Sequence, residues 1–310
     1  MIKVIQVDPT FFGQYDLLAE GQVLHAKSFG ASEDAATVKI RKATSQALKA
    51  ADTQGLKTLM LPVINSRSEN IAPVTTAQVM ISEVRRHLSL GSKLQEITFV
   101  LPDEAGARAF NEVAHRDTIL CLGDSITFGY PEGPQISWVA RVSKVTGFKL
   151  FNRGISGETT GQMLARFIKY REESLSAYMI FLGGHNDGWQ GIPLKETQEN
   201  IKQVVELAFE RGICPLLGLP SPLNIQQLLE NFEGDQEDAE NYNHKLGQIR
   251  DWLREFAMDR GIFTLDFYTP LLSKDTGNPE LLLDGGHPTP GGYKILGDEI
   301  ITQLRGRLYL

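Results

Sequence analysis

Cysteine is scarce in this chain: only Cys121 and Cys214 occur among the 310 residues. Each lies in or beside an apolar run, where a free thiol is commonly buried. Two such cysteines do not provide the set of disulfide bonds that stabilises small secreted domains. A hydrophobic core must therefore hold the fold together, and the chain is long enough for two domains.

Long hydrophobic runs are also missing. None approaches the roughly 20 residues that a helix needs to cross a bilayer. The first residues lack the apolar stretch and the cleavage site of a secretory signal peptide. We therefore expect a cytoplasmic protein that does not associate with membranes.

Basic residues are fewer than acidic residues, which gives a net charge of −7 at pH 7. Residues 1–114 carry equal numbers of acidic and basic side chains, so the whole excess falls on residues 115–310. Nucleic acid is not an expected partner of such a chain. Part of the excess forms an acidic cluster, which we interpret as a solvated loop leading into a helix N-terminus: Glu233, Asp235, Glu237, Asp238 and Glu240.

Strand-like and helix-like segments alternate twice along the chain, which predicts an α/β fold. The first alternation predicts an accessory α/β domain over residues 1–114, and the second a larger domain over residues 115–310. The larger domain is predicted to be a three-layer α/β/α sandwich with a five-stranded parallel sheet. Strands are expected at 3–8, 22–28, 56–63 and 96–101 in the first domain and at 118–122, 149–151, 178–182, 216–219 and 262–266 in the second.

Ser125 directly follows the predicted strand 118–122, in the sequence Gly123-Asp124-Ser125. Open α/β sheets bind their ligands just outside the carboxyl ends of the strands. A serine at this point is either a helix N-cap or a nucleophile. Three more loops are expected at the same edge of the sheet, and they carry Gly154, Asn186, and the pair Asp284 and His287.

These loops bring together the groups that a serine nucleophile needs. His287 can accept the hydroxyl proton, and Asp284 can hold the imidazole through its other ring nitrogen. Donors for a developing oxyanion are the backbone N–H groups of Ser125 and Gly154 and the side-chain amide of Asn186. Taken singly, His287 is equally a surface loop residue, Asp284 a turn former and Asn186 a turn residue.

Three more residues are candidate contacts for a substrate. Trp189 is the large aromatic residue beside Asn186, while His185 is either packed in its loop or in contact with substrate. Asp124 also orders the nucleophile loop by accepting from backbone amides. We expect no metal and no cofactor, because the histidines have no third ligand at a recognisable spacing.

Residues 117–310 resemble the SGNH, or GDSL, hydrolase superfamily. Four blocks carry the resemblance, in family order: Gly123-Asp124-Ser125, Gly154, Gly184-His185-Asn186-Asp187 and Asp284-Gly285-Gly286-His287-Pro288. The resemblance implies that Ser125 is the nucleophile, that Asp284 and His287 complete a triad, and that Gly154 and Asn186 belong to the oxyanion hole. The Gly-x-Ser-x-Gly elbow of the α/β-hydrolases is absent around Ser125.

Two stretches of the first domain, 47–63 and 73–110, resemble the carboxy-terminal two-thirds of a macro domain, the fold that binds ADP-ribose, in their pattern of apolar positions. The glycine-rich phosphate loop of that family is replaced here by residues 65–70, which contain no glycine. An accessory or dimerising role therefore competes with nucleotide binding.

A serine hydrolase that cleaves a small ester through an acyl-enzyme is the function we expect. The loops at 130–137, 189–193 and 221–231 are predicted to wall the pocket, and their modest length favours a short acyl group, such as acetyl on a sugar-like alcohol. The alternatives are a thioesterase or lysophospholipase, a nucleotide-binding module coupled to deacylation of an acylated nucleotide, and a non-catalytic scaffold.

Overall fold

The computed structural model describes residues 1–7, 18–19, 22–23, 36–64, 71–170 and 175–309. Its packing divides the chain into two compact units. The first contains Met1–Arg116, Ala208–Cys214 and Gly306–Leu310, and the second contains Asp117–Leu207 and Pro215–Arg305. Within the described ranges, no helix has both the length and the apolar character that crossing a membrane requires.

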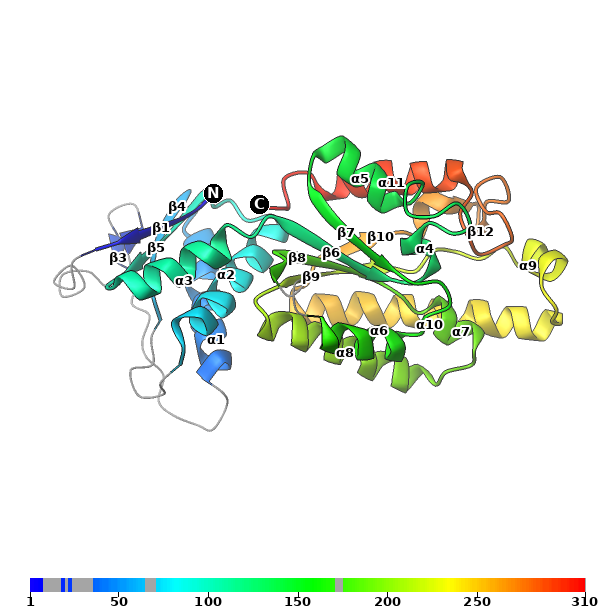
Figure 1. Ribbon diagram of the computed structural model, residues 1–310, viewed down its shortest axis with the longest axis horizontal. Helices are drawn as coiled ribbons and strands as arrows, with labels where there is room; N and C mark the ends of the chain where they lie inside the picture. Colours follow the sequence, from blue (N-terminus) through cyan, green and yellow to red (C-terminus); the bar gives the residue numbers. More distant parts are fainter. Residues whose placement is uncertain (8–17, 20–21, 24–35, 65–70, 171–174, 310) are drawn as a thin grey trace. The chain divides into compact units, whose positions relative to one another are not determined.

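The first unit is built on a parallel sheet of three strands in the order β1–β5–β4 (Figure 1). Its strands are β1 (Ile2–Gln6), β4 (Thr58–Pro62) and β5 (Glu96–Leu101), and its helices are α1 (Ala36–Thr53), α2 (Pro73–Ser89) and α3 (Glu104–Ala114). Apolar side chains from the sheet and helices form one core, which includes Leu48, Leu59, Met80, Phe99 and Phe110.

The predicted strand at 22–28 is present in its described part, β3 (Gln22–Val23), which pairs antiparallel with β2 (Leu18–Ala19) in a separate two-stranded sheet. Residues 24–28 lie outside the described ranges. Only two residues separate β2 from β3, a spacing that favours a hairpin over a parallel crossover. The likeness to a macro domain stays a prediction, because the loop at 65–70 also lies outside the described residues.

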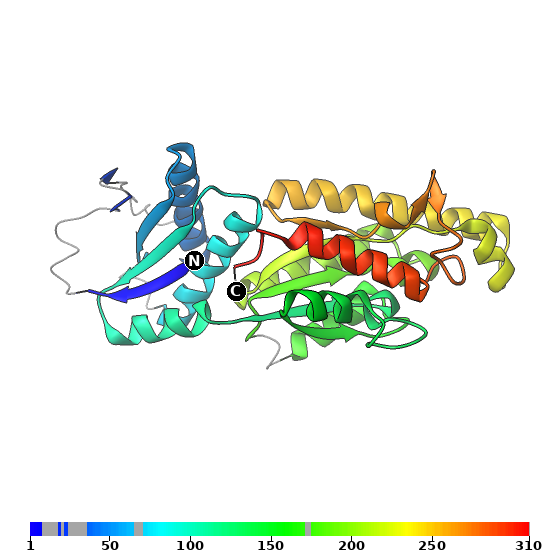
Figure 2. The same ribbon diagram turned by 90° about the horizontal axis from the view of Figure 1, so that it is seen from above.

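The second unit contains the five-stranded parallel sheet that the sequence predicts, in the order β10–β9–β8–β6–β7. Helices α5 and α11 lie on one side of this sheet, and α6, α8 and α10 lie on the other (Figures 1 and 2). The strands are β6 (Thr118–Gly123), β7 (Lys149–Gly154), β8 (Tyr178–Leu182), β9 (Cys214–Leu219) and β10 (Thr264–Asp266). The long helices are α5 (Trp138–Thr146), α6 (Thr160–Lys169), α8 (Leu194–Glu210), α10 (Gln236–Arg260) and α11 (Pro290–Leu304).

Side-chain caps fix where the helices around the sheet begin. The Ser137 hydroxyl accepts from the N–H of Ala140 at the start of α5, and Thr159 forms a capping box with Gln162 at the start of α6. Thr289 caps α11 ahead of a proline at the first helical position. These caps determine how far each loop extends at the carboxyl edge of the sheet.

Three shorter helices occupy that edge: α4 (Ser125–Phe128), α7 (His185–Trp189) and α9 (Ile225–Asn231). In the register of the sheet, Gly123 at the end of β6 is level with Gly154 of β7 and Leu182 of β8. The segments that follow β6 and β8 therefore start from the same height and place α4 and α7 close together. A 3₁₀ turn (Thr269–Leu271) and the short strands β11 (Leu272–Ser273) and β12 (Thr276–Gly277) precede the loop that carries His287.

Candidate active site

Ser125 is the first residue of α4, and its hydroxyl is not the cap of that helix. The N-cap is Asp124, whose Oδ1 accepts from the N–H of Ile126 at 3.0 Å. The Ser125 hydroxyl is therefore available for another partner, and Ser125 Oγ lies 2.9 Å from Nε2 of His287. Of the two alternatives for this serine, the geometry excludes the N-cap and leaves the nucleophile.

Asp284 holds the other side of the His287 ring. Its Oδ2 lies 2.7 Å from His287 Nδ1, and its Oδ1 accepts from the backbone N–H groups of Gly286 and His287 at 3.1 and 2.8 Å. Burial acts to raise the pKa of Asp284, but these hydrogen bonds outweigh it, so the pKa is lowered. Asp284 is therefore a carboxylate at neutral pH and favours the tautomer of His287 whose Nε2 is an acceptor.

The loop from Asp284 to His287 depends on one glycine conformation. Gly285 has φ of +91°, and a Cβ at this position would lie 2.5 Å from the backbone nitrogen of Leu228. Only glycine meets both conditions without strain. The loop closes where the N–H of Leu283 donates to the carbonyl of His287 at 2.8 Å, which fixes the side chains of Asp284 and His287 on the same side.

Two of the three predicted oxyanion donors lie at the cavity beside Ser125. The N–H of Ser125 has no acceptor among the described residues and stands at the start of α4. Asn186, in the first turn of α7, donates one amide hydrogen from Nδ2 to the carbonyl of Glu158 at 2.9 Å, which leaves the second for a ligand. Both residues line the cavity.

Gly154, the third predicted donor, is not placed for that role. Its N–H donates to Oδ1 of Asn152 at 2.9 Å, and it does not line the cavity. Gly154 is the last residue of β7 and packs so tightly on α4 that a Cβ would lie 2.1 Å from the nitrogen of Phe128. Gly157 lines the cavity instead, with φ of +83°, and its N–H has no acceptor in the described part of the chain.

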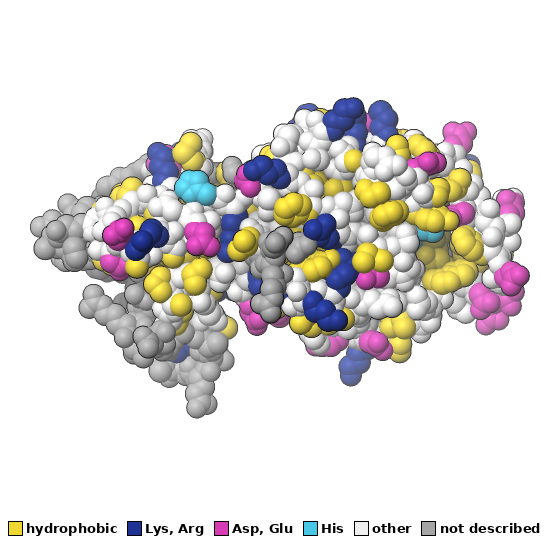
Figure 3. Space-filling view, in the orientation of Figure 1, with side chains coloured by type: hydrophobic (Ala, Val, Ile, Leu, Met, Phe, Trp, Pro, Cys, Tyr) yellow, Lys and Arg dark blue, Asp and Glu magenta, His cyan; other side chains and the backbone are white. Residues whose placement is uncertain are grey.

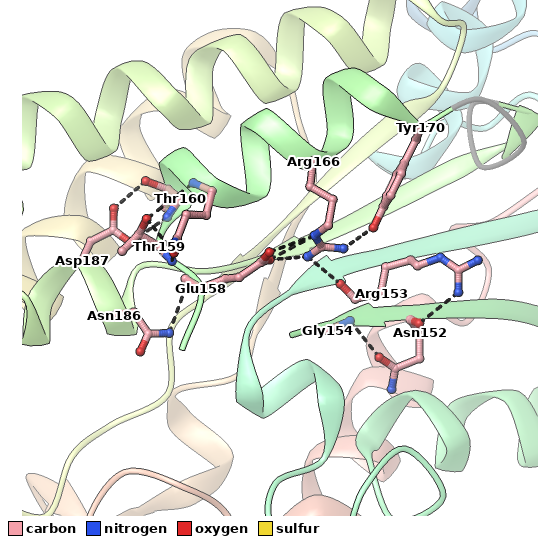
Figure 4. A network of polar contacts seen from close by, with 11 residues as sticks. Asn152, Arg153, Gly154, Glu158, Thr159, Thr160, Arg166, Tyr170, Asn186 and Asp187 are labelled. Carbon is pink, nitrogen blue, oxygen red and sulfur yellow. Dashed lines mark hydrogen bonds and ion pairs between the residues drawn. The ribbon is translucent and has the colours of Figure 1, made fainter. Parts of the chain in front are cut away.

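A network of polar contacts holds the segment that contains Gly157 (Figure 4). The carboxylate of Glu158 accepts from Arg166 Nε at 3.0 and 3.1 Å and forms an ion pair with Nη2 of the same guanidinium. Nη2 also donates to the carbonyl of Arg153 at 3.0 Å. Because the Glu158 carbonyl accepts from Asn186, Arg166 positions the peptide that orients the Asn186 amide.

Asp187 fixes the other end of this segment. It is fully buried, and its carboxylate accepts from the N–H of Thr160 at 2.9 Å and from the hydroxyl of Thr197 at 3.0 Å. These contacts join α7 to the first residue of α6, as Figure 4 shows for Thr160, and to the first turn of α8. The side chain thus braces its loop.

The remaining candidate contacts for a substrate, Trp189 and His185, differ in their surroundings. Trp189 lines the cavity and is 47% exposed. His185 also lines it, but its Nδ1 and Nε2 lie 2.8 and 2.9 Å from the hydroxyls of Tyr242 and Ser221. Burial lowers the pKa of His185 to about 3, so the ring is neutral and its nitrogens are engaged within the protein. This geometry favours the packed-loop alternative for His185.

Asp124 does not line the cavity, so this geometry does not favour its predicted contact with substrate. The side chain is fully buried beneath α4, and Oδ2 has no hydrogen-bond partner among the described residues. Burial raises the pKa of Asp124 to about 7, against the opposing effects of the Ile126 N–H and His287.

This raised pKa predicts a pH-dependent stability. The folded state keeps the Asp124 proton between pH 3.8 and about 7, where the unfolded state loses it, so folding stability falls as the pH rises through that window. Asp124→Asn keeps the cap and removes the ionisation. We expect the drop in melting temperature between pH 5 and pH 8 to be smaller in this variant by about 5 °C. Asp275→Asn, in an exposed turn, is the control and should melt like the wild type; an unchanged drop in Asp124→Asn would contradict the prediction.

The cavity around Ser125, called the Ser125 cavity below, has a volume of about 230 Å³. Tyr130, the first residue of the loop predicted to wall the pocket at 130–137, lines it, and its ring centroid lies 4.5 Å from that of His287. Sequence reasoning missed Phe232 and Tyr242, which also line the cavity. In the sequence, Tyr242 shares one apolar helical face with Leu246 and Ile249, a pattern that indicates burial but not a cavity. In the described part of the chain, no group of three His, Cys, Asp or Glu side chains could hold a metal ion.

Comparison with known proteins matches this chain to one protein family. The model of the GDSL-like Lipase/Acylhydrolase family matches residues 121–295. Thioesterase 1/protease 1/lysophospholipase L1 of Escherichia coli K12 is 30% identical over 106 residues, which cover 34% of this chain and 51% of that protein. The chain thus spans about half the length of this relative. Isoamyl acetate-hydrolyzing esterase of Saccharomyces cerevisiae is 26% identical over 61% of this chain and 86% of its own length.

Solved structures agree with the family match. A lipolytic protein of the G-D-S-L family from Desulfitobacterium hafniense DCB-2 is 27% identical, with a TM-score of 0.53 over 61% of this chain and 100% of its own. A GDSL-like lipase from Bacteroides thetaiotaomicron VPI-5482 is 25% identical, with a TM-score of 0.50 over 61% of this chain and 88% of its own.

Proposed function

The chain belongs to the GDSL-like lipase/acylhydrolase family, and from this premise we propose that it is a serine esterase that hydrolyses short-chain carboxylic esters at Ser125. One observation carries the proposal: the hydroxyl of Ser125, the imidazole of His287 and the carboxylate of Asp284 form a continuous chain of contacts of 2.9 and 2.7 Å. Because a serine hydroxyl is a weak nucleophile until a base accepts its proton, this chain supplies what the reaction requires.

Acylation begins when Nε2 of His287 accepts the proton of Ser125 and Oγ attacks the ester carbonyl carbon. Asp284 stabilises the resulting imidazolium and holds its orientation. The imidazolium then gives the proton to the alcohol oxygen as the carbon–oxygen bond breaks, which leaves the acyl group on Oγ. A water molecule, deprotonated by the same imidazole, hydrolyses this acyl-enzyme and returns the hydroxyl to Ser125.

The negative charge that develops on the carbonyl oxygen needs hydrogen-bond donors that are already in place. We propose the N–H of Ser125, the second amide hydrogen of Asn186 and the N–H of Gly157, in place of Gly154. Arg166 and Asp187 act as positioning residues, because they hold the two ends of the segment that presents the Gly157 N–H and the Glu158 carbonyl.

The size of the Ser125 cavity favours a small acyl group. Its volume of about 230 Å³ lies below the roughly 300–1,000 Å³ of common ligand pockets. Trp189, Leu228 and Phe232 line it with apolar surface. We therefore propose acetyl or a similarly short acyl chain on a small or sugar-like alcohol, whose ring could stack on the exposed face of Trp189.

A series of 4-nitrophenyl esters tests the proposal. We expect kcat/KM for the acetate to exceed that for the octanoate at least tenfold, because a hydrophobic pocket discriminates a single methylene by about tenfold and the octanoyl chain is several methylenes longer. A fluorophosphonate should label Ser125 stoichiometrically, as shown by the mass of the modified peptide. Faster turnover of the octanoate would favour the thioesterase or lysophospholipase alternative, and labelling of another residue would refute the assignment of the nucleophile.

A further inference from the structure

A second cavity, larger than the first, adjoins the Ser125 cavity. Its volume is about 510 Å³, and the linings of the two cavities have Trp189, Leu228, Phe232 and Tyr242 in common. A substrate whose ester group is held at Ser125 can therefore extend along this shared wall into the larger space. The proposed reaction leaves the second cavity without a role.

The shared wall is aromatic and partly open to solvent. Trp189 and Phe232 are 47% and 39% exposed, and their ring centroids lie 5.6 Å apart with the planes tilted by 58°. Tyr242 stands edge-on to Trp189, also at 5.6 Å. Aromatic faces attract cations through the ring quadrupole, and tryptophan does so most strongly. The wall can hold either an apolar group or a cationic one.

The charges around the second cavity decide between these groups. Glu233, Asp235 and Asp238 line it against a single basic residue, Lys245, whose Nζ donates to the carbonyl of Ile192 at 2.5 Å. Acidic side chains gather beside exposed hydrophobic ones at this end of the unit in Figure 3. A cavity lined by charges of one sign concentrates the opposite sign within it. The aromatic wall alone can hold either kind of group, and the carboxylates around the cavity favour a positively charged ligand.

We propose that the second cavity binds the alcohol part of the ester and that this alcohol carries an ammonium group. The inference rests on the proposed function, because a short acyl group in the smaller cavity leaves the alcohol as the larger part of the substrate. The chemistry is unchanged: the bond from Oγ of Ser125 to the acyl carbon forms, the bond to the alcohol oxygen breaks, and a protonated amino alcohol leaves after taking a proton from His287.

A matched pair of acetates tests the charge preference on the full-length protein. 2-(Dimethylamino)ethyl acetate, protonated at pH 6.5, has nearly the same shape as isoamyl acetate and differs in the positive charge. We expect kcat/KM for the cationic ester to be about tenfold higher. Raising the salt concentration from 0.05 to about 0.5 M should reduce that ratio, because screening weakens the attraction of the carboxylates. A ratio of one or less in the wild type would overturn the inference.

Variants locate the source of the preference. The double variant Glu233→Gln and Asp238→Asn should bring the ratio of the two esters close to one, whereas Glu240→Gln should leave it as in the wild type. Glu240 belongs to the same acidic cluster but does not line the cavity, so it controls for the general field of the cluster. A ratio that survives the double variant, or that Glu240→Gln lowers equally, would overturn the proposed site.

Equilibrium binding separates this inference from the proposed function. Calorimetry on the Ser125→Ala variant compares protonated 2-(dimethylamino)ethanol with 3-methylbutanol, and tighter binding of the amino alcohol by about tenfold is expected. If 4-nitrophenyl acetate is hydrolysed but neither assay shows a charge preference, the esterase function stands and the inference fails. If no ester is hydrolysed but the amino alcohol binds preferentially, the site stands and the proposed function fails.

Discussion

Replacing Ser125 by alanine is expected to lower kcat for 4-nitrophenyl acetate by about 10⁵-fold to 10⁶-fold. The variant keeps the cavity, the oxyanion donors and His287, and loses the oxygen that attacks the carbonyl carbon. Steady-state kinetics with enzyme at micromolar concentration would measure the residual rate. Within the described part of the chain, the side chain that is removed makes one hydrogen bond, to His287, so the melting temperature should stay within a few degrees of the wild type.

Ser156→Ala is the matched control for this loss. Ser156 lines the same cavity, but His287 Nε2 bonds to Ser125 and not to Ser156. We expect its replacement to change kcat less than tenfold. If Ser156→Ala were as damaging as Ser125→Ala, or if Ser125→Ala retained a tenth of the activity with no reversion of the sample, the assignment of the nucleophile would be wrong.

Replacing Asp284 by asparagine should lower kcat by about 10⁴-fold with little change in the size of the side chain. The carboxylate accepts from Nδ1 of His287, which leaves Nε2 without a hydrogen and able to accept the Ser125 proton. An amide nitrogen at this position can donate to Nδ1 and thereby favour the opposite tautomer, in which Nε2 carries the hydrogen. Kinetics from pH 6 to 9 would measure the loss, which should persist at every pH.

Asp266→Asn provides a control with the same local geometry. Asp266 Oδ1 accepts from the N–H groups two and three residues ahead, at 2.8 and 2.9 Å, as Asp284 Oδ1 does. Among the described residues, its side chain has no histidine partner, so the asparagine variant should keep the activity of the wild type. Equal losses in both variants would mean that Asp284 acts by shaping its turn, which would refute its role in orienting His287.

The sequence was sufficient to predict that the candidate triad and Asn186 meet at one site. Ser125, Asn186 and the pair Asp284 and His287 follow strands or precede a helix at one edge of a parallel sheet, and strand polarity alone brings such loops together. The three-layer α/β/α sandwich was predicted from the alternation of strand-like and helix-like segments. Both inferences use patterns that are local in the sequence and that tertiary packing reinforces.

Gly154 shows where this reasoning fails. The sequence predicted a strand that ended at Phe151, because Asn152, Arg153 and Gly154 are polar or small and are typical of a loop. In the fold, β7 runs on to Gly154, since it is the edge strand next to β6 and its outer side need not be apolar. The loop therefore begins three residues later, and the glycine at the cavity is Gly157. Only the pairing partner of a strand reveals such an extension.

The second cavity could not be predicted from sequence patterns, and the reason is a different one. Its shared wall combines Trp189 of α7 with Phe232 and Tyr242, which lie more than 40 residues further along the chain. Each of these aromatic residues is equally typical of a core position, and no spacing links them. Their proximity depends on the packing of α10 against α7 and α9, which is a property of the assembled unit.

The two cysteines, finally, have a practical consequence. Cys121 and Cys214 are both fully buried, and burial raises the pKa of Cys121 and brings that of Cys214 to about 12. Neither sulfur is therefore open to alkylating reagents while the protein is folded. A cysteine introduced at an exposed position such as Trp189 would be the single reactive thiol, so a fluorophore or spin label could be attached at the mouth of the cavity without first removing the native sulfhydryls.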